Sequence, residues 1–119
     1  MADIALEELR RRLGEDDLVV VDVRTRHEFS GDAGAGCDPR QGHIPGALNI
    51  PLERLLESSS AVQVRALMDV TEGAEIVAYC HSGSRSAFAV QVLRAAGYDA
   101  RNYVGSWHEW SADESLPVE

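Results

Sequence analysis

Residues 76–97 read IVAYCHSGSRSAFAVQVLRAAG, and the change of pattern within them decides the fold. The apolar residues 76–79 predict a short buried strand that delivers Cys80 to a loop of small residues. Residues 85–96 are rich in alanine and valine, which predicts a helix that ends at Gly97. A strand, a tight loop and a helix in this order are typical of a sheet whose faces are covered by helices.

The rest of the chain repeats this alternation of strands and helical segments. Its pattern predicts further strands at 18–23, 47–50 and 101–104, and helices at 51–57, 62–68 and 107–112. We therefore expect an α/β fold in a single domain, residues 1–119, with a mostly parallel central sheet of about five strands and helices on both faces.

Two features of the N-terminal half are less regular. Asp3 is predicted to cap a helix whose leucines form an apolar stripe and which Gly14 closes. Residues 25–43 form a long Gly-rich connection, which is unusual inside a compact domain. We expect this connection to be functional or mobile.

Composition and charge limit the partners. The net charge of −9 argues against a nucleic-acid surface, which depends on clustered basic side chains. The chain holds eleven arginines and no lysine, so an anion site must use arginine, histidine or backbone amides. No apolar run approaches the about 20 residues that a membrane helix needs, and the N-terminus lacks the pattern of a secretory signal. We expect a cytoplasmic protein with no nucleic-acid or membrane partner.

Cys80 is the candidate nucleophile. A thiol reacts as a thiolate, and the free amides at a helix N-terminus favour that negative charge. Gly83 lets the backbone bend around the sulfur, and Arg85 adds a permanent positive charge. The alternative is a buried core cysteine at the end of a strand. The polar residues that follow Cys80 favour the reactive interpretation, with partly open surroundings.

The two cysteines, Cys37 and Cys80, are too few for a disulfide framework. Cys37 reads as an incidental exposed thiol, with a resolving or second sulfur-carrying cysteine as the alternative. A zinc site made from Cys80, His43, His81 and His108 is conceivable, but no close pair of ligands indicates one. We therefore expect no metal.

Four segments of the chain resemble signatures of rhodanese-like sulfurtransferases and follow one another in the family's order. They are CHSGSR at 80–85, which fits Cys-x-x-Gly-x-Arg, VVDVR at 20–24, GHIPGA at 42–47, and GSWHEW at 105–110 with LPVE at 116–119. The last is similar to the end of the catalytic half of two-domain thiosulfate and mercaptopyruvate sulfurtransferases. The resemblance covers essentially the whole chain and implies a rhodanese-like single domain.

The resemblance also implies a reaction. Cys80 would take the outer sulfur of a donor such as thiosulfate as a persulfide and pass it to cyanide or to a thiol such as thioredoxin or glutathione. No metal or organic cofactor is required. The residues that would bind the donor are His81, Ser82, Gly83, Ser84 and Arg85. Arg85 would hold the anionic end of the donor or order the loop through a carboxylate.

Four further residues are expected to support the site. Asp22 and Arg24 resemble the family's Asp-x-Arg pair, with a structural role. His43 would fix its turn through the backbone, with proton transfer as the alternative, and Trp107 would line the pocket. Glu28 falls where the two-domain enzymes carry a substrate-binding arginine, which argues against efficient use of thiosulfate and toward single-domain relatives.

Three other functions compete with a sulfurtransferase. Cysteine phosphatases of related fold place five residues between cysteine and arginine, whereas four separate Cys80 from Arg85, so the ring suits sulfur better than phosphate. A persulfide carrier or sulfur-sensing module would need the same motif residues and stays the main alternative. An inactive interaction domain is disfavoured because such relatives usually lose the cysteine.

Overall fold

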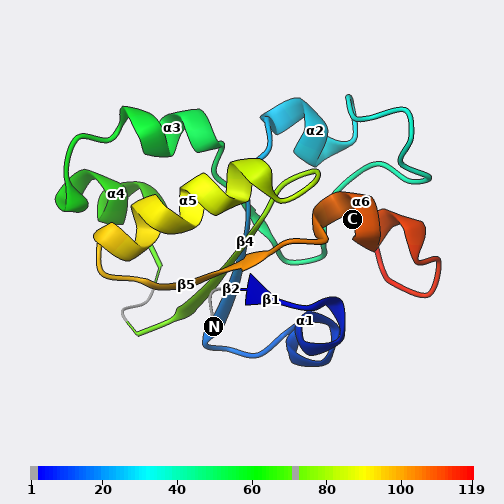
Figure 1. Ribbon diagram of the computed structural model, residues 1–119, viewed down its shortest axis with the longest axis horizontal. Helices are drawn as coiled ribbons and strands as arrows, with labels where there is room; N and C mark the ends of the chain where they lie inside the picture. Colours follow the sequence, from blue (N-terminus) through cyan, green and yellow to red (C-terminus); the bar gives the residue numbers. More distant parts are fainter. Residues whose placement is uncertain (1–2, 71–72) are drawn as a thin grey trace.

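The computed structural model of the protein describes residues 3–70 and 73–119. Its centre is a five-stranded sheet in the order β1-β5-β4-β2-β3, in which neighbouring strands run parallel (Figure 1). The strands are β1 Asp3–Ile4, β2 Leu18–Asp22, β3 Leu48–Asn49, β4 Glu75–Tyr79 and β5 Asp99–Tyr103. The expected α/β fold with a central sheet of five strands is confirmed.

Helices cover both faces of the sheet. They are α1 Leu6–Arg12, α2 Arg26–Ser30, α3 Leu52–Glu57, α4 Ala61–Met68, α5 Ser84–Ala95 and α6 Ser106–Ala112. One core lies between the sheet and α3, α4 and α5, and a second lies between the sheet and α1 and α6 (Figure 1). Within the described ranges, no helix combines the length and the apolar character needed to cross a membrane.

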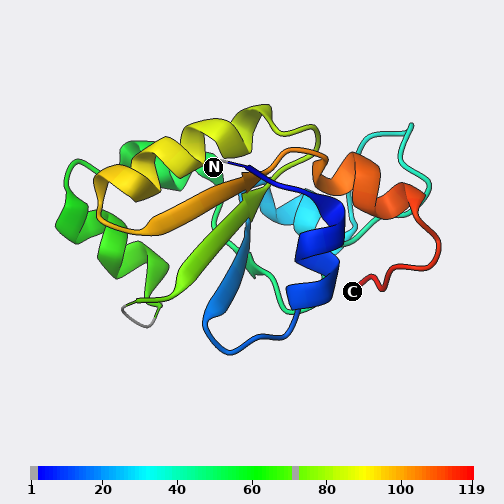
Figure 2. The same cartoon turned by 60° about the horizontal axis from the view of Figure 1, so that its bottom comes forward.

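The pairing of β2 with β4 brings the residues that follow these two strands to the same end of the sheet. The pairs run from Leu18 opposite Glu75 to Asp22 opposite Tyr79, and the Val23 amide extends them by donating to the Tyr79 carbonyl. The central strands therefore end together (Figure 2). Ligands of parallel sheets bind beyond these carboxyl ends, where Cys80 emerges.

The prediction that Asp3 caps a helix was wrong. Asp3 lies in the edge strand β1, opposite Asn102, and Ala5 stands at the N-cap of α1 without a side-chain hydrogen bond. The strand forms because Ile4, which is 3% exposed, packs into the core beside β5. A strand of two residues leaves no alternating pattern in the sequence.

The connection at 25–43 is not wholly irregular, because α2 lies inside it. Thr25 and Glu28 form a reciprocal capping box, in which the Glu28 amide donates to Thr25 Oγ1 and the Thr25 amide donates to Glu28 Oε1. Gly31 ends the helix with a left-handed φ of 91°. The Thr-x-x-Glu spacing is a recognised start signal, so this helix was predictable from the sequence.

Candidate active site

The sulfur of Cys80 lies at the N-terminal end of α5. Its Sγ accepts hydrogen bonds from the amides of Gly83 at 3.1 Å and Ser86 at 3.4 Å, and it lies 3.3 Å from Ser86 Oγ. Gly83 is the N-cap residue of α5, so both amides belong to the free donors of the helix start. These groups favour a negative charge on the sulfur.

The balance of burial and hydrogen bonding lowers the pKa of the Cys80 thiol. Burial alone raises this pKa, but the Ser86 hydroxyl and amide, then the Gly83 and Ser82 amides, outweigh it. The sequence pointed to the amides between His81 and Arg85. It missed Ser86, whose hydroxyl and amide are the largest favourable contributions.

Cys80 is more enclosed than expected. The residue is 1% exposed and belongs to the core between the sheet and α5. The sequence predicted partly open surroundings for this cysteine, and the structure instead encloses it. A donor therefore has to pass the loop residues that cover the sulfur.

Gly83 is required by its surroundings. Its φ is 95°, and an added Cβ would lie 2.7 Å from the Val104 carbonyl oxygen. The Gly83 carbonyl in turn accepts a hydrogen bond from the Asn102 side chain at 3.1 Å. Any side chain here would force the loop away from β5, as expected for a left-handed, closely packed position.

The start of α6 holds the other side of the loop. Ser106 Oγ accepts from the Cys80 amide at 3.1 Å, and the Trp107 amide donates to the Cys80 carbonyl at 2.9 Å. The His108 amide donates to the His81 carbonyl at 3.0 Å. The sequence did not single out Ser106, because this contact joins residues 26 positions apart.

Arg85 is paired with Glu28. Its Nη1 and Nη2 atoms donate to the two carboxylate oxygens at 2.9 Å and 3.1 Å. This pairing lowers the pKa of Glu28 to about 2, with burial opposing it and the Thr25 amide assisting. Of the two roles expected for Arg85, the contacts fit the ordering of α2 and the loop through a carboxylate.

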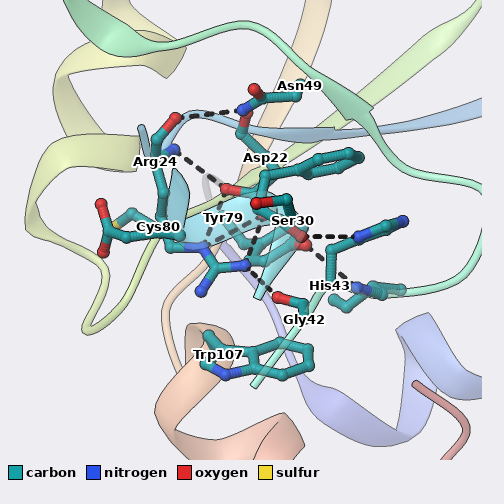
Figure 3. Close-up of polar contacts among 12 residues, drawn as sticks. Asp22, Arg24, Ser30, Gly42, His43, Asn49, Tyr79, Cys80 and Trp107 are labelled. Atoms are coloured by element: carbon teal, nitrogen blue, oxygen red, sulfur yellow. Dashed lines mark hydrogen bonds and ion pairs between the residues drawn. The ribbon is translucent and has the colours of Figure 1, made fainter. Parts of the chain in front are cut away.

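Asp22 and Arg24 form a second pair, which is fully buried (Figure 3). Arg24 Nη2 donates to Asp22 Oδ2 at 2.7 Å and to the Gly42 carbonyl at 2.6 Å. Its guanidinium carbon lies 5.0 Å from the centre of the Trp107 ring. The pair therefore joins the C-terminal end of β2, the 42–47 turn and α6.

His43 lies away from the sulfur, on the other side of the Asp22–Arg24 pair in Figure 3. Its Nδ1 is 2.8 Å from the Phe29 carbonyl, and its ring stacks on Phe29 at 3.7 Å. Its amide donates to the Glu119 carbonyl at 2.9 Å. These contacts fit a residue that fixes its turn through the backbone.

The remaining site candidates divide between the loop rim and the core. Ser82 and Ser84 are exposed, and His81 is half-buried with its ring directed to Asp38. Trp107 is buried beneath Arg24, and its indole nitrogen donates to the Arg40 carbonyl at 3.0 Å.

Comparison with known families matches residues 5–113 to the rhodanese-like domain. The thiosulfate sulfurtransferase of Pseudomonas aeruginosa is 35% identical, over 95% of this chain and 44% of the relative. The thiosulfate:glutathione sulfurtransferase of Homo sapiens is 35% identical, over 94% of this chain and 95% of the relative. A crystal structure of a probable thiosulfate sulfurtransferase has a TM-score of 0.83 at 42% identity, over 99% of this chain and 47% of that one.

One relative carries a different description. The sulfur carrier protein TtuD of Thermus thermophilus is 36% identical, over 83% of this chain and 40% of the relative. The chain spans less than half the length of these bacterial relatives, whereas the human relative has nearly the same extent.

Proposed function

The chain belongs to the rhodanese-like domain family, and on this basis we propose that it is a sulfurtransferase. It moves a sulfane sulfur from thiosulfate or a similar donor to a thiophilic acceptor, either cyanide or a thiol such as thioredoxin or glutathione. The observation that carries this proposal is the cluster of donors around Cys80 Sγ, with Gly83 and Ser86 amides at 3.1 Å and 3.4 Å. We also place the protein in the cytoplasm.

The first half-reaction transfers sulfur to the enzyme. The Cys80 thiolate attacks the outer sulfur of thiosulfate, a new S–S bond forms, and the S–S bond of the donor breaks as sulfite leaves with the electron pair. The product is a negatively charged persulfide on Cys80. The amides that favour the thiolate stay close to this second anion, so they stabilise the charge on both sides of the step.

The second half-reaction regenerates the thiolate. A nucleophilic acceptor, such as cyanide, attacks the outer sulfur of the persulfide, and the Cys80 sulfur leaves as the thiolate. Thiocyanate is the product with cyanide. The lowered pKa of Cys80 helps here as well, because a better-stabilised thiolate is a better leaving group. Neither half-reaction calls for a metal or an organic cofactor.

The other proposed site residues surround this centre. The loop residues that meet the donor are His81, Ser82, Gly83, Ser84 and Arg85. The supporting residues are Asp22, Arg24 and Trp107, which lie behind the loop, and His43, which fixes the neighbouring turn at 42–47. The Arg85 guanidinium is paired with the Glu28 carboxylate, so an anionic donor has to compete with that carboxylate for the arginine.

The second candidate is a persulfide carrier. The enclosure of Cys80, which is 1% exposed, favours it because a small free donor has little access to the sulfur. A partner protein that opens the loop would then deliver the sulfur. The similarity to a sulfur carrier supports keeping this candidate.

The test combines steady-state kinetics with mass measurement. Thiosulfate and cyanide should give turnover with ping-pong kinetics, and thiosulfate alone should add one sulfur to the intact protein. Cys80→Ser should lose both, while Cys37→Ser, the matched control, should keep both. Turnover by folded Cys80→Ser would remove Cys80 from the mechanism. Negligible turnover by the parent, with ready loading from a protein persulfide donor, would favour the carrier.

A further inference from the structure

Three side chains converge on the carboxylate of Asp38, beside the sulfur centre. They are those of Cys37, His81 and His108, and one possible ligand atom from each of the four residues lies within 4.8 Å of all the others. Cys37 and Asp38 come from the 25–43 connection, His81 follows Cys80, and His108 lies on α6. Three distant chain segments thus place a thiol, a carboxylate and two imidazoles together.

Asp38 is the centre of this cluster, and its hydrogen bonding is uneven. Its side chain is 1% exposed. His81 Nε2 and His108 Nδ1 lie 3.1 Å and 3.0 Å from Oδ1, and the Cys37 sulfur lies 3.9 Å from the same oxygen. Oδ2 is buried without a hydrogen-bond partner among the described residues, although His81 Nε2 is 3.0 Å away. A buried carboxylate oxygen left in this state is costly.

A metal ion would satisfy this arrangement. Zinc bonds of about 2.0 to 2.3 Å place neighbouring tetrahedral ligands about 3.3 to 3.8 Å apart. The separations of 3.0, 3.1 and 3.9 Å from Asp38 Oδ1 lie a few tenths of an ångström outside that range, so small shifts of these side chains would make room for the ion. A thiolate and a carboxylate supply two negative charges, and imidazole with thiolate is a donor set suited to Zn²⁺. We infer that Cys37, Asp38, His81 and His108 bind a divalent cation of the zinc type.

The backbone around Asp38 is fixed in a way that suits a ligand site. Arg40, two residues further on, donates to the carbonyls of Trp110, Ser111, Asp113 and Leu116 at 2.7 to 3.2 Å. These bonds tie the end of the connection to α6, which carries His108, and to the segment that follows α6. Cys37 is exposed and the His108 side chain is 57% exposed, so an ion can enter from solvent.

This site differs from the zinc site considered from the sequence. That alternative combined His81 and His108 with Cys80 and His43. The structure holds Cys80 Sγ at Gly83 and Ser86 and packs His43 on Phe29, and it brings Cys37 and Asp38 to the two histidines in their place. Cys37 and Asp38, which are adjacent in the sequence, supply the close pair of ligands. Their contacts with His81 and His108 have no local signature, because these residues lie 43 and 70 positions away from Asp38.

Metal binding is best measured in the Cys80→Ser protein, because Cys37 is then the only thiol of the chain. Zn²⁺ titrated by calorimetry into metal-free protein should bind with a stoichiometry of one. Co²⁺ should give the intense spectrum of tetrahedral coordination with a thiolate-to-metal band. Adding Cys37→Ala should remove that band, and Cys37→Ala, Asp38→Asn or His108→Ala should each weaken Zn²⁺ binding by about tenfold or more.

His27→Ala is the matched control, since the His27 side chain is 79% exposed and lies outside the cluster. It should leave Zn²⁺ affinity unchanged. Cys37 and His108 are also exposed, so their variants test the site even if Asp38→Asn unfolds the protein. Binding that survives both Cys37→Ala and His108→Ala, or that disappears in the Cys80→Ser protein itself, would overturn the inference. These readouts do not depend on sulfur transfer, so they stand apart from the test of the proposed function.

Discussion

Two arginine–carboxylate pairs lie at the same edge of the sheet, and they differ in burial. In the Arg24–Asp22 pair the side chains are 1% and 0% exposed, whereas in the Arg85–Glu28 pair they are 36% and 18% exposed. The shortest nitrogen–oxygen contact is 2.7 Å in the first pair and 2.9 Å in the second. Burial therefore separates a pair that holds the fold together from one that can exchange its partner.

The buried pair has no room for exchange. Besides Asp22, Arg24 donates to the Gly42 carbonyl, and its guanidinium packs against Trp107. Burial lowers the pKa of Arg24, but the bonds to Asp22 outweigh this and raise it. Removing either partner would leave an uncompensated charge in the core, which is far more costly than losing an exposed pair.

The largest expected effect comes from Arg24→Ala. It leaves Asp22 buried without its partner, so we expect the free energy of unfolding to fall by about 3–5 kcal/mol. Urea denaturation followed by circular dichroism measures this. Arg85→Ala makes the matched change in the Arg85–Glu28 pair, called the rim pair below. It should lower the free energy of unfolding by about 1 kcal/mol or less. Equal losses in the two variants would show that burial does not separate the pairs.

Glu28→Gln tests whether Arg85 can exchange its carboxylate partner for the sulfur donor. It frees Arg85 from a carboxylate, so the KM for thiosulfate should fall about fivefold, which corresponds to about 1 kcal/mol. Steady-state kinetics with cyanide as acceptor measures this. Glu53→Gln, an equal change of charge at an exposed position of α3, is the control and should leave the KM unchanged. An unchanged KM in Glu28→Gln would mean that Arg85 only orders the loop.

The sequence could predict what depends on neighbouring residues. The strand before Cys80, the loop and α5 follow one another within 76–97, so their pattern contains all the information needed. The capping box of α2 is equally local, because Thr25 and Glu28 lie three residues apart, and this spacing is enough to predict the start of the helix.

The rest of the site depends on contacts between distant segments. Glu28 reaches Arg85 across 57 positions, and Asp38 reaches His108 across 70. Neither contact has a local signature, because it exists only once the strands have set the register of the loops. The same holds for Ser106, which holds the Cys80 amide from the start of α6.

The rim pair should also respond to acid. The pKa of Glu28 is lowered from 4.5 in a free carboxyl to about 2 in the folded protein. A depressed folded pKa stabilises the fold above the unfolded value, and this contribution is lost as the pH falls from about 4.5 toward 2. After allowance for solvent screening, we expect a loss of about 1 kcal/mol.

Urea midpoints across that pH range measure this loss. Glu28→Gln, which cannot titrate, should show a shallower decline than the parent, and Glu53→Gln should follow the parent. A parent and Glu28→Gln that decline in parallel would show that Glu28 titrates normally.

The smallest effect is expected for an exposed pair on α1. Arg10 Nη2 lies 2.7 Å from Glu7 Oε1, the same distance as in the buried Arg24–Asp22 pair, but its side chains are 54% and 68% exposed. Arg10→Ala should change the free energy of unfolding by no more than about 0.5 kcal/mol, since water replaces the lost contact and alanine is as good a helix former. Urea denaturation beside Arg24→Ala makes the comparison direct. A comparable loss in both would mean that contact distance, and not burial, sets the strength of these pairs.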